Sequence, residues 1–270
     1  MNKRGGHEHN SMTQHVPRPL VLRIPHTPFE PVEAAVSCFV DSSQIETFTG
    51  SDYAGPAANN PSILALFGHS DLRTATILSD QFKLVFVVSS GWRHFHRSYH
   101  YHRNEADSPA YWFAARHYEA EYAAHIRSLH QDNFQTRWLM GESGMNSNEI
   151  DLASLSQVVN TLTAIDALVI PENRLMEGLV LLAEKMNWPI PVLPQSIFPD
   201  PSTTDESNEA LNLTVRKINH LDDALFATAQ SQFEDRLTQS KLDVDEKVKD
   251  MKRLMLAKEV RAEMTKAAAC

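Results

Sequence analysis

The stretch "FKLVFVVSSGWRHFHRSYHYHR", residues 82–103, joins an apolar run to a segment rich in histidine, arginine and aromatic side chains. Residues 83–88 are mostly β-branched and apolar, which is typical of a strand buried on both faces of a parallel sheet. Two serines and a glycine follow, and they favour a loop that opens into a helix. In an open parallel sheet, the loop after such a strand lies at the edge where ligands bind.

Similar strand and helix units lie on either side of this stretch. Residues 20–24 form a short apolar run, and a helix is expected to start near Pro31. A second run ends at 68–69 and leads into a short helix from Asp71. "AIDALVIP", residues 164–171, is a further buried strand, and it precedes a helix with an apolar stripe at Leu175, Leu179, Leu182 and Met186. The segments 41–61 and 189–208 are predicted to be loops.

The remaining segments are predicted to be helical. These are 98–130, 151–163 and two C-terminal helices that begin near 220 and 243. In the first, Tyr111, Ala115, Tyr118 and Tyr122 are expected near one face, which is interpreted as core, with a sugar-binding platform as the alternative. In the last, the expected apolar face is Val244, Val248, Met251, Leu254 and Met255. Strands separated by helices predict an α/β fold of three layers, with a central parallel sheet flanked by helices and C-terminal helices added.

Composition limits the class of protein. The 270 residues are 42% hydrophobic and 22% charged, which is ordinary for one globular domain. A net charge of −9 gives no general attraction to nucleic acid. The only cysteines are Cys38 and Cys270, so a disulfide framework is not expected. No apolar run is long enough for a membrane span, which predicts an intracellular, soluble protein, cytoplasmic or organellar.

Five segments occur in an order that resembles the carbohydrate sulfotransferases of the uronyl 2-O- and galactose-3-O-sulfotransferase type. They are Gly68–His69 at a strand end, "FKLVFVV" followed by "RSYHYHR", "DNFQTRWLMGE" (132–142), "IDALVIPENRLMEGLVLLAEKMNW" (165–188) and "LDDALFATAQSQFEDRL" (221–237). The resemblance covers residues 19–240 and implies a fold like that of P-loop proteins. It divides the chain into an N-terminal arm (1–18), the sulfotransferase-like domain (19–240) and a C-terminal helix and tail (241–270).

The resemblance also implies a chemistry, the transfer of a sulfuryl group from PAPS to a sugar hydroxyl. In the family, a loop with a lysine holds the 5′-phosphosulfate through backbone N–H groups and a helix N-terminus. A second loop supplies an arginine and a serine to the 3′-phosphate. A histidine takes the proton from the acceptor hydroxyl.

The first of these loops, "RIPHTPFEPV" (23–32), departs from the family pattern. His26 stands where the lysine belongs, and Thr27 matches. Pro28, Phe29 and Glu30 replace glycine and hydroxyl residues. Because proline has no N–H and Glu30 places a carboxylate at a helix N-terminus, this loop is poorly suited to a phosphate.

The second loop departs as well. Ser89 or Ser90 occupies the arginine position, whereas Ser98 fits the family's serine. Arg93 or Arg97 could reach the 3′-phosphate only after a rearrangement. Both halves of the cofactor site are therefore expected to be degraded, and no cofactor is expected unless the protein is active, in which case it is PAPS.

Other candidate site residues are histidines and the polar residues of the third segment. His69 and His26 are the candidate catalytic residues, and the alternative for His69 is a helix cap or a packed strand end. Asn133, Gln135 and Arg137 are candidates for the substrate side, and the alternative is a polar helix N-terminus that stabilises the fold.

A metal site is not expected from the sequence. His94, His96, His100 and His102 are close together, and His96 and His100 are four residues apart on a possible helix. However, no carboxylate or cysteine lies at ligand spacing beside them, and the family needs no metal.

The sequence thus predicts a sulfotransferase-fold protein that is catalytically degenerate and acts as a structural or binding component of a larger assembly. Protein partners are expected at the N-terminal arm and the C-terminal helix, whose methionine-rich face suits irregular surfaces. The alternatives are an active PAPS-dependent sulfotransferase that modifies carbohydrate, and a sensor that binds a nucleotide or sulfated ligand without turnover.

Overall fold

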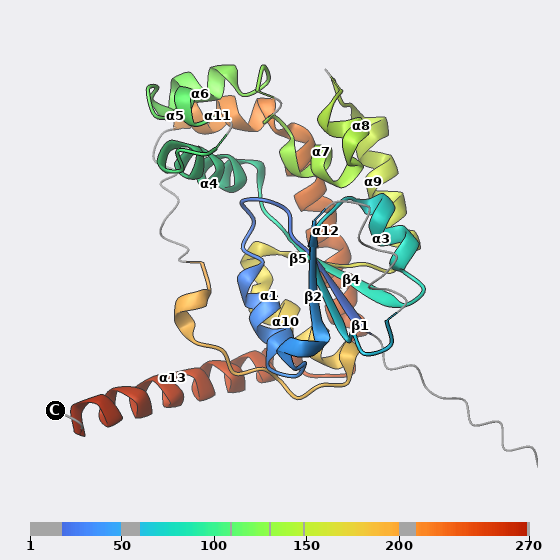
Figure 1. Cartoon of the computed structure of the whole chain (residues 1–270), viewed down its shortest axis with the longest axis vertical. Coiled ribbons are helices and arrows are strands. Elements are labelled where there is room, and N and C mark those ends of the chain that lie inside the picture. Colours follow the sequence, from blue (N-terminus) through green and yellow to red (C-terminus); the bar gives the residue numbers. More distant parts are fainter. Residues whose placement is uncertain are drawn as a thin grey trace, which may run out of the picture.

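The fold is built on a sheet of five parallel strands in the order β2-β3-β1-β4-β5 (Figure 1). It is seen in a computed structural model that describes residues 18–49, 60–108, 110–129, 131–147, 149–199 and 209–268. The predicted α/β class, with a parallel sheet flanked by helices and helices added at the C-terminus, is confirmed. The strands are β1 (Arg18–Leu22), β2 (Ile45–Thr49), β3 (Ala65–His69), β4 (Phe82–Val88) and β5 (Leu168–Pro171).

Alternating side chains of the central strands form two separate cores. Leu84 and Phe86 of β4 enter one core, and Val85 and Val87 enter the other, as the period of a strand requires. The first core packs against α3 (Leu72–Leu78), α9 (Leu152–Ala164) and α12 (His220–Gln239). The second packs against α1 (Glu30–Ser37), α10 (Leu175–Met186) and the start of α13 (Val244–Ala268).

A third core, made by helices, lies beyond the carboxyl end of β4. Trp92, Phe95 and Tyr99 pack there against Tyr122 and Val215. The helices are α4 (Gly91–Asn104), α5 (Tyr111–Ala114), α6 (Glu119–His125) and α11 (Glu209–Ile218), which lie together in Figure 1. The short helices α7 (Phe134–Met140) and α8 (Glu142–Met145) connect this region to α9.

Some short elements differ from the sequence prediction. The predicted loop 41–61 contains the edge strand β2, in which only Phe48 is buried, so its hydrophobic pattern is weak. The predicted helix 98–130 is three helices, and the first begins at Gly91. The prediction that the tyrosines of segment 98–130 share one packed face is wrong, since Tyr122 is buried but Tyr118 is 78% exposed. Helix α11 and the exposed position of Leu254 on α13 were also not predicted.

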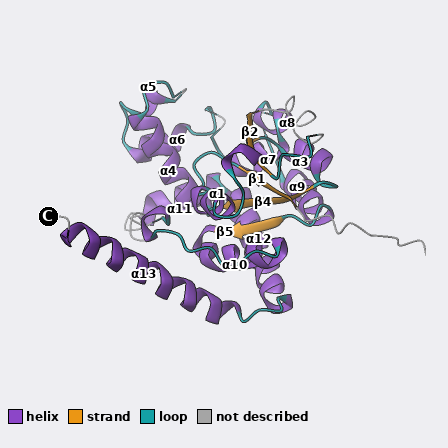
Figure 2. Ribbon diagram, turned by 60° about the horizontal axis from the view of Figure 1, so that its bottom comes forward, coloured by secondary structure: helices purple, strands orange, loops and turns teal. Residues whose placement is uncertain are grey.

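Helix α13 packs against the core through its first half, and in its second half the Glu259 carboxylate accepts from the backbone N of Gln195 over 3.0 Å. Val244 and Val248 are buried in the second core, and Met251 and Met255 of the same helix are buried as well, as predicted. The second half extends away from the body of the molecule, as Figures 1 and 2 show. None of the helices in the described parts of the chain combines the length and the hydropathy that a membrane span requires.

Candidate functional site

A cavity of about 690 Å³ opens at the carboxyl ends of β1 and β3. In the strand order, β2 and β3 lie on one side of β1, and β4 and β5 lie on the other. The order therefore changes direction at β1. This is the switch point at which open α/β sheets bind ligands. The cavity is lined by Pro25, His26, Thr27, Pro28, Phe29, Glu30, His69, Arg97, Tyr101, His102, Gln131, Phe134, Met145 and Pro199.

His26 lies in the loop between β1 and α1 and faces aromatic side chains. Its φ of 64° is in the left-handed region, which is uncommon for a residue other than glycine or asparagine. The ring centroid lies 4.7 Å from that of Tyr101 and 5.3 Å from that of His102. Burial, then the nearby His102 and Arg97, lower the pKa of His26 to about 3. His26 is therefore neutral at pH 7 and does not supply the positive charge of the family's lysine.

Two further histidines of α4 lie at this site, His102 in the cavity lining and His94 behind it. His94 is buried, stacks on Phe134 and donates from Nε2 to the carbonyl oxygen of Pro25 over 3.0 Å. Burial and the neighbouring His26 hold the pKa of His94 well below its usual value. His102 bonds to Ser108 through Nδ1, and its buried Nε2 has no hydrogen-bond partner among the described residues.

His69 ends β3 and lines the same cavity from the other side. Its ring packs edge-on against Phe29 and Trp138. Partial burial, followed by the positive charge of Arg23, lowers the pKa of His69. A neutral imidazole at the cavity wall can accept a proton, so the geometry is compatible with the expected general base, although the lowered pKa makes it a weak one.

The two arginines considered for the 3′-phosphate share one buried carboxylate. Glu172, directly after β5, has a side chain that is 2% exposed. Arg93 Nη1 donates to Glu172 Oε1 over 2.9 Å, and Arg97 Nη2 pairs with Glu172 Oε2. Arg97 Nη2 also donates to Ser89 Oγ over 3.2 Å. Arg97 reaches the cavity, where its buried Nη1 has no partner among the described residues.

The loop after β1 uses several of its polar groups internally. Thr27 donates to the carbonyl oxygen of Ile24 from both Oγ1 and its backbone N, over 2.8 and 3.2 Å. The backbone N of Phe29 donates to Thr27 O over 3.0 Å. Ser98 lies further along α4, buried in the helical region, and donates to Gln131 Oε1 at 3.5 Å.

Asn133 and Gln135 are buried in a hydrogen-bond network outside the cavity lining. Gln135 bonds both backbone groups of Ser89, accepting from N and donating to O at 2.8 Å each. Asn133 Oδ1 accepts from the backbone N of Leu221 over 2.9 Å. Asp222 on α12 accepts from the backbone N of Gln135 and of Thr136, and so caps α7 from another helix.

Arg137 belongs to the same buried segment. Its guanidinium donates to the carbonyl oxygens of Asp132, Gly144 and Ser147 over 2.7 to 2.9 Å. It also pairs with the carboxylate of Asp132 at 3.2 Å. These contacts correspond to the alternative in which the polar residues of this segment stabilise the fold.

The structure therefore brings four of the candidate residues to one cavity: His26, Thr27, His69 and Arg97. Sequence reasoning did not single out Glu172, Tyr101 or Gln131 for this site. Only Glu172 carried a signal, because an acidic residue directly follows the apolar run of β5, and β5 pairs with β4.

Searches against protein-family models, curated proteins and solved structures give no match to this chain. The resemblance to carbohydrate sulfotransferases thus rests on the sequence segments quoted above. What the geometry itself defines is a parallel α/β protein with an aromatic, histidine-lined cavity at the switch point of its sheet.

Proposed function

We propose that this protein has a sulfotransferase-like fold, has lost the donor chemistry of that family, and acts as a binding or structural component of a larger protein assembly. The observation that carries the proposal is the loop between β1 and α1. Pro25, Pro28 and Pro31 have no N–H, and the N–H groups of Thr27 and Phe29 are bonded within the loop. Few donors remain at the position where a phosphosulfate would need them.

The charges near the cavity support the same proposal. Glu172 neutralises much of the positive charge that Arg93 and Arg97 would otherwise offer to a phosphate. Glu30 adds a carboxylate to the cavity wall at the first position of α1. The Glu30 carboxylate already occupies the positive N-terminal end of α1. It would repel a phosphate bound beside it, because both groups are negatively charged.

A surface suited to a partner is found on the second half of α13. Leu256, Val260 and Met264 are 62%, 47% and 68% exposed and repeat every four residues along one side of the helix. Together with Ala257 they form an apolar strip on the helix surface, beside Arg253, Arg261 and Thr265. An apolar stripe on a helix that extends from the body is a common way to present a docking surface to another protein.

The proposal is tested by isothermal titration of the full chain with adenosine 3′,5′-bisphosphate, the spent form of the donor. We expect no detectable heat at millimolar ligand. The Glu172→Gln variant is the matched comparison, because it frees the two arginines and is expected to gain weak binding. Micromolar binding by the unmodified chain would overturn the proposal, since it would mean that other residues have rebuilt the site.

One observation favours the alternative, an active PAPS-dependent sulfotransferase that modifies carbohydrate. Arg97 Nη1 and His102 Nε2 are buried polar atoms of cavity-lining residues, and neither has a hydrogen-bond partner in the described structure. A ligand oxygen could satisfy them. Sulfuryl transfer from PAPS to a sugar hydroxyl, lost in both His26→Ala and Arg97→Ala, is the result expected from this alternative. Unchanged activity in the two variants would exclude it as formulated.

A further inference from the structure

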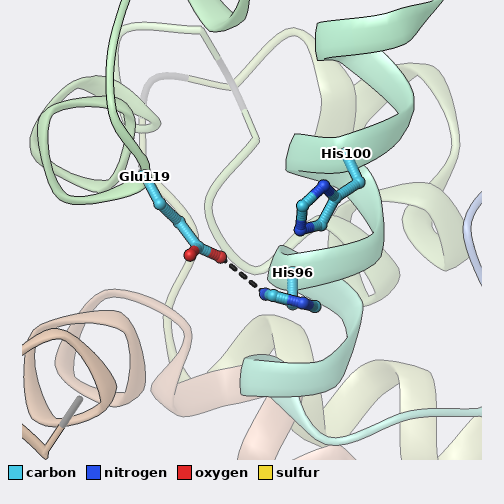
Figure 3. A group of neighbouring side chains, drawn as sticks. All are labelled: His96, His100 and Glu119. Atoms are coloured by element: carbon cyan, nitrogen blue, oxygen red, sulfur yellow. Dashed lines mark hydrogen bonds and ion pairs between the residues drawn. The ribbon is translucent and has the colours of Figure 1, made fainter. Parts of the chain in front are cut away.

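The structure brings a carboxylate to the two histidines that are spaced four residues apart. His96 and His100 project from successive turns of α4, and Glu119, at the start of α6, reaches toward them (Figure 3). One ligand atom from each residue lies within 4.8 Å of the others. His96 Nδ1 is 2.6 Å from Glu119 Oε1. This carboxylate was not expected from the sequence, because a segment that includes α5 lies between α4 and Glu119 in the chain.

We propose that His96, His100 and Glu119 form a binding site for a divalent transition metal, with Zn²⁺ as the preferred ion. Two imidazole nitrogens and one carboxylate oxygen are a common protein ligand set for zinc. Zinc holds such ligands at about 2.0 to 2.2 Å, so small side-chain rotations are enough to close the three groups around an ion. The fourth position remains open to water or to a ligand from a partner.

The surroundings of the three side chains suit a site that an ion can enter. The side chains of His96 and Glu119 are 14% and 23% exposed, and His100 lies on the surface. His96 stacks against Trp92, which limits its rotation and holds its ring near the site. The negative charge of the Glu119 carboxylate also attracts a dication. Arg103 lies one turn further along α4, but its guanidinium donates to the hydroxyl of Tyr99.

A metal here would connect α4 to α6 across the third core. Besides His96 and His100, α4 carries Arg97 and Tyr101, which line the cavity. Fixing α4 would therefore also stabilise one wall of the cavity. This inference is independent of the proposed function, because it concerns a different face of the helix and requires no nucleotide.

The test is isothermal titration of the chelator-treated full chain with ZnCl₂, comparing His100→Ala with His220→Ala. His100 is exposed, so its removal is expected to leave the fold intact in chelator, and His220 is an exposed histidine distant in sequence on α12. Both variants keep the N-terminal His7, His9 and His15, so zinc bound by those residues contributes equally. We expect His100→Ala to weaken the binding event at least about tenfold and His220→Ala to leave it unchanged.

A second measurement decides the question if His100→Ala proves unstable. The chain with His7, His9 and His15 replaced by alanine is titrated with Co²⁺, whose visible absorption reports its coordination. Intense bands of a four- or five-coordinate ion, lost in Glu119→Gln, are the expected result. A spectrum of hydrated Co²⁺, or equal zinc affinity in His100→Ala and the unmodified chain, would overturn the site and leave a hydrogen bond between His96 and Glu119.

Discussion

Gln135 completes the hydrogen bonding at the end of β4 in the way that a neighbouring strand would. Its side chain accepts from the backbone N of Ser89 and donates to the backbone O of the same residue, each at 2.8 Å. Both Gln135 and Ser89 are fully buried, so no water can replace these bonds. One side chain thus fixes where β4 ends and where the loop toward α4 begins.

We expect Gln135→Ala to lower the free energy of unfolding by about 2 to 4 kcal/mol, because two buried backbone groups lose their partners. Urea denaturation followed by circular dichroism measures the change. The control is Gln239→Ala at the exposed end of α12, where a change within about 0.5 kcal/mol is expected. Equal stability of the two variants would show that Ser89 finds other partners.

His26 is expected to make the protein sensitive to acid. Burial, together with His102 and Arg97, lowers its pKa to about 3 in the folded chain, whereas the unfolded chain has the ordinary value of 6.5. Between about pH 3 and pH 6.5, the unfolded state therefore binds more protons at His26 than the folded state does. The stability that His26 contributes is complete above pH 6.5 and is lost as the pH falls from there toward 3.

Replacement of this residue by asparagine should reduce the acid sensitivity. Asparagine tolerates the left-handed backbone at this position and does not titrate in this range. From pH 7 to pH 5, we expect the unmodified chain to lose about 1 to 2 kcal/mol more than His26→Asn. Thermal denaturation in a pH series, with His220→Asn as the control, provides the measurement. Parallel curves for the unmodified chain and His26→Asn would contradict the assigned cause.

At the scale of elements, the strands that are apolar throughout could be predicted, including the edge strand β5, whereas the other edge strand, β2, could not. β4 and β5 are short apolar runs, as strands of a covered parallel sheet must be. β2 buries only Phe48 and therefore has no apolar run that distinguishes it from the turn-forming residues around it. Helix α10 was predictable from its stripe, whereas the breaks between α4, α5 and α6 depend on packing within the third core.

The part of the candidate site that lies at the ends of strands could be predicted from the sequence. Loops after β1, β3 and β4 meet at one edge of a parallel sheet, and this fixed the expected positions of His26 and His69. The pairing of Arg97 with Glu172 could not be foreseen, because 75 residues separate them in the chain. The same holds for Asn133, whose partner Leu221 lies on a distant helix.

The two halves of α13 should respond differently to the same substitution. Met251, on the first half, is fully buried, whereas Met264 is 68% exposed on the extended half. We expect Met251→Ala to cost about 2 to 5 kcal/mol of stability, because it leaves a cavity, and Met264→Ala to change it by less than about 0.5 kcal/mol. Guanidinium denaturation measures both. A comparable loss in Met264→Ala would mean that the extended half packs against something in solution, such as a second copy of the chain.

At the scale of the whole molecule, α12 is the element that joins the three cores. Its side chains enter the first core through Leu221 and Leu225 and the second through Phe233. Asp223, in its first turn, accepts from the backbone N of Gly91 over 2.8 Å and so holds the start of α4. Asn219, directly before α12, accepts from the backbone N of Asn133 over 2.7 Å. Together with the pairing of Arg93 and Arg97 with Glu172, these polar contacts attach the helical region to the sheet.

This arrangement predicts that the third core opens more readily than the sheet. In hydrogen exchange of the full chain, we expect amides of α5 and α6 to exchange faster than those of β1 and β4, because the third core is smaller and is held by few contacts. Asn219→Ala removes the acceptor for the buried N–H of Asn133. It should accelerate exchange in α6 and α11 while β1 and β4 keep their protection. Exchange that rises equally in the strands and in these helices would instead show that the chain unfolds as one cooperative unit, with α12 transmitting the loss to both sides.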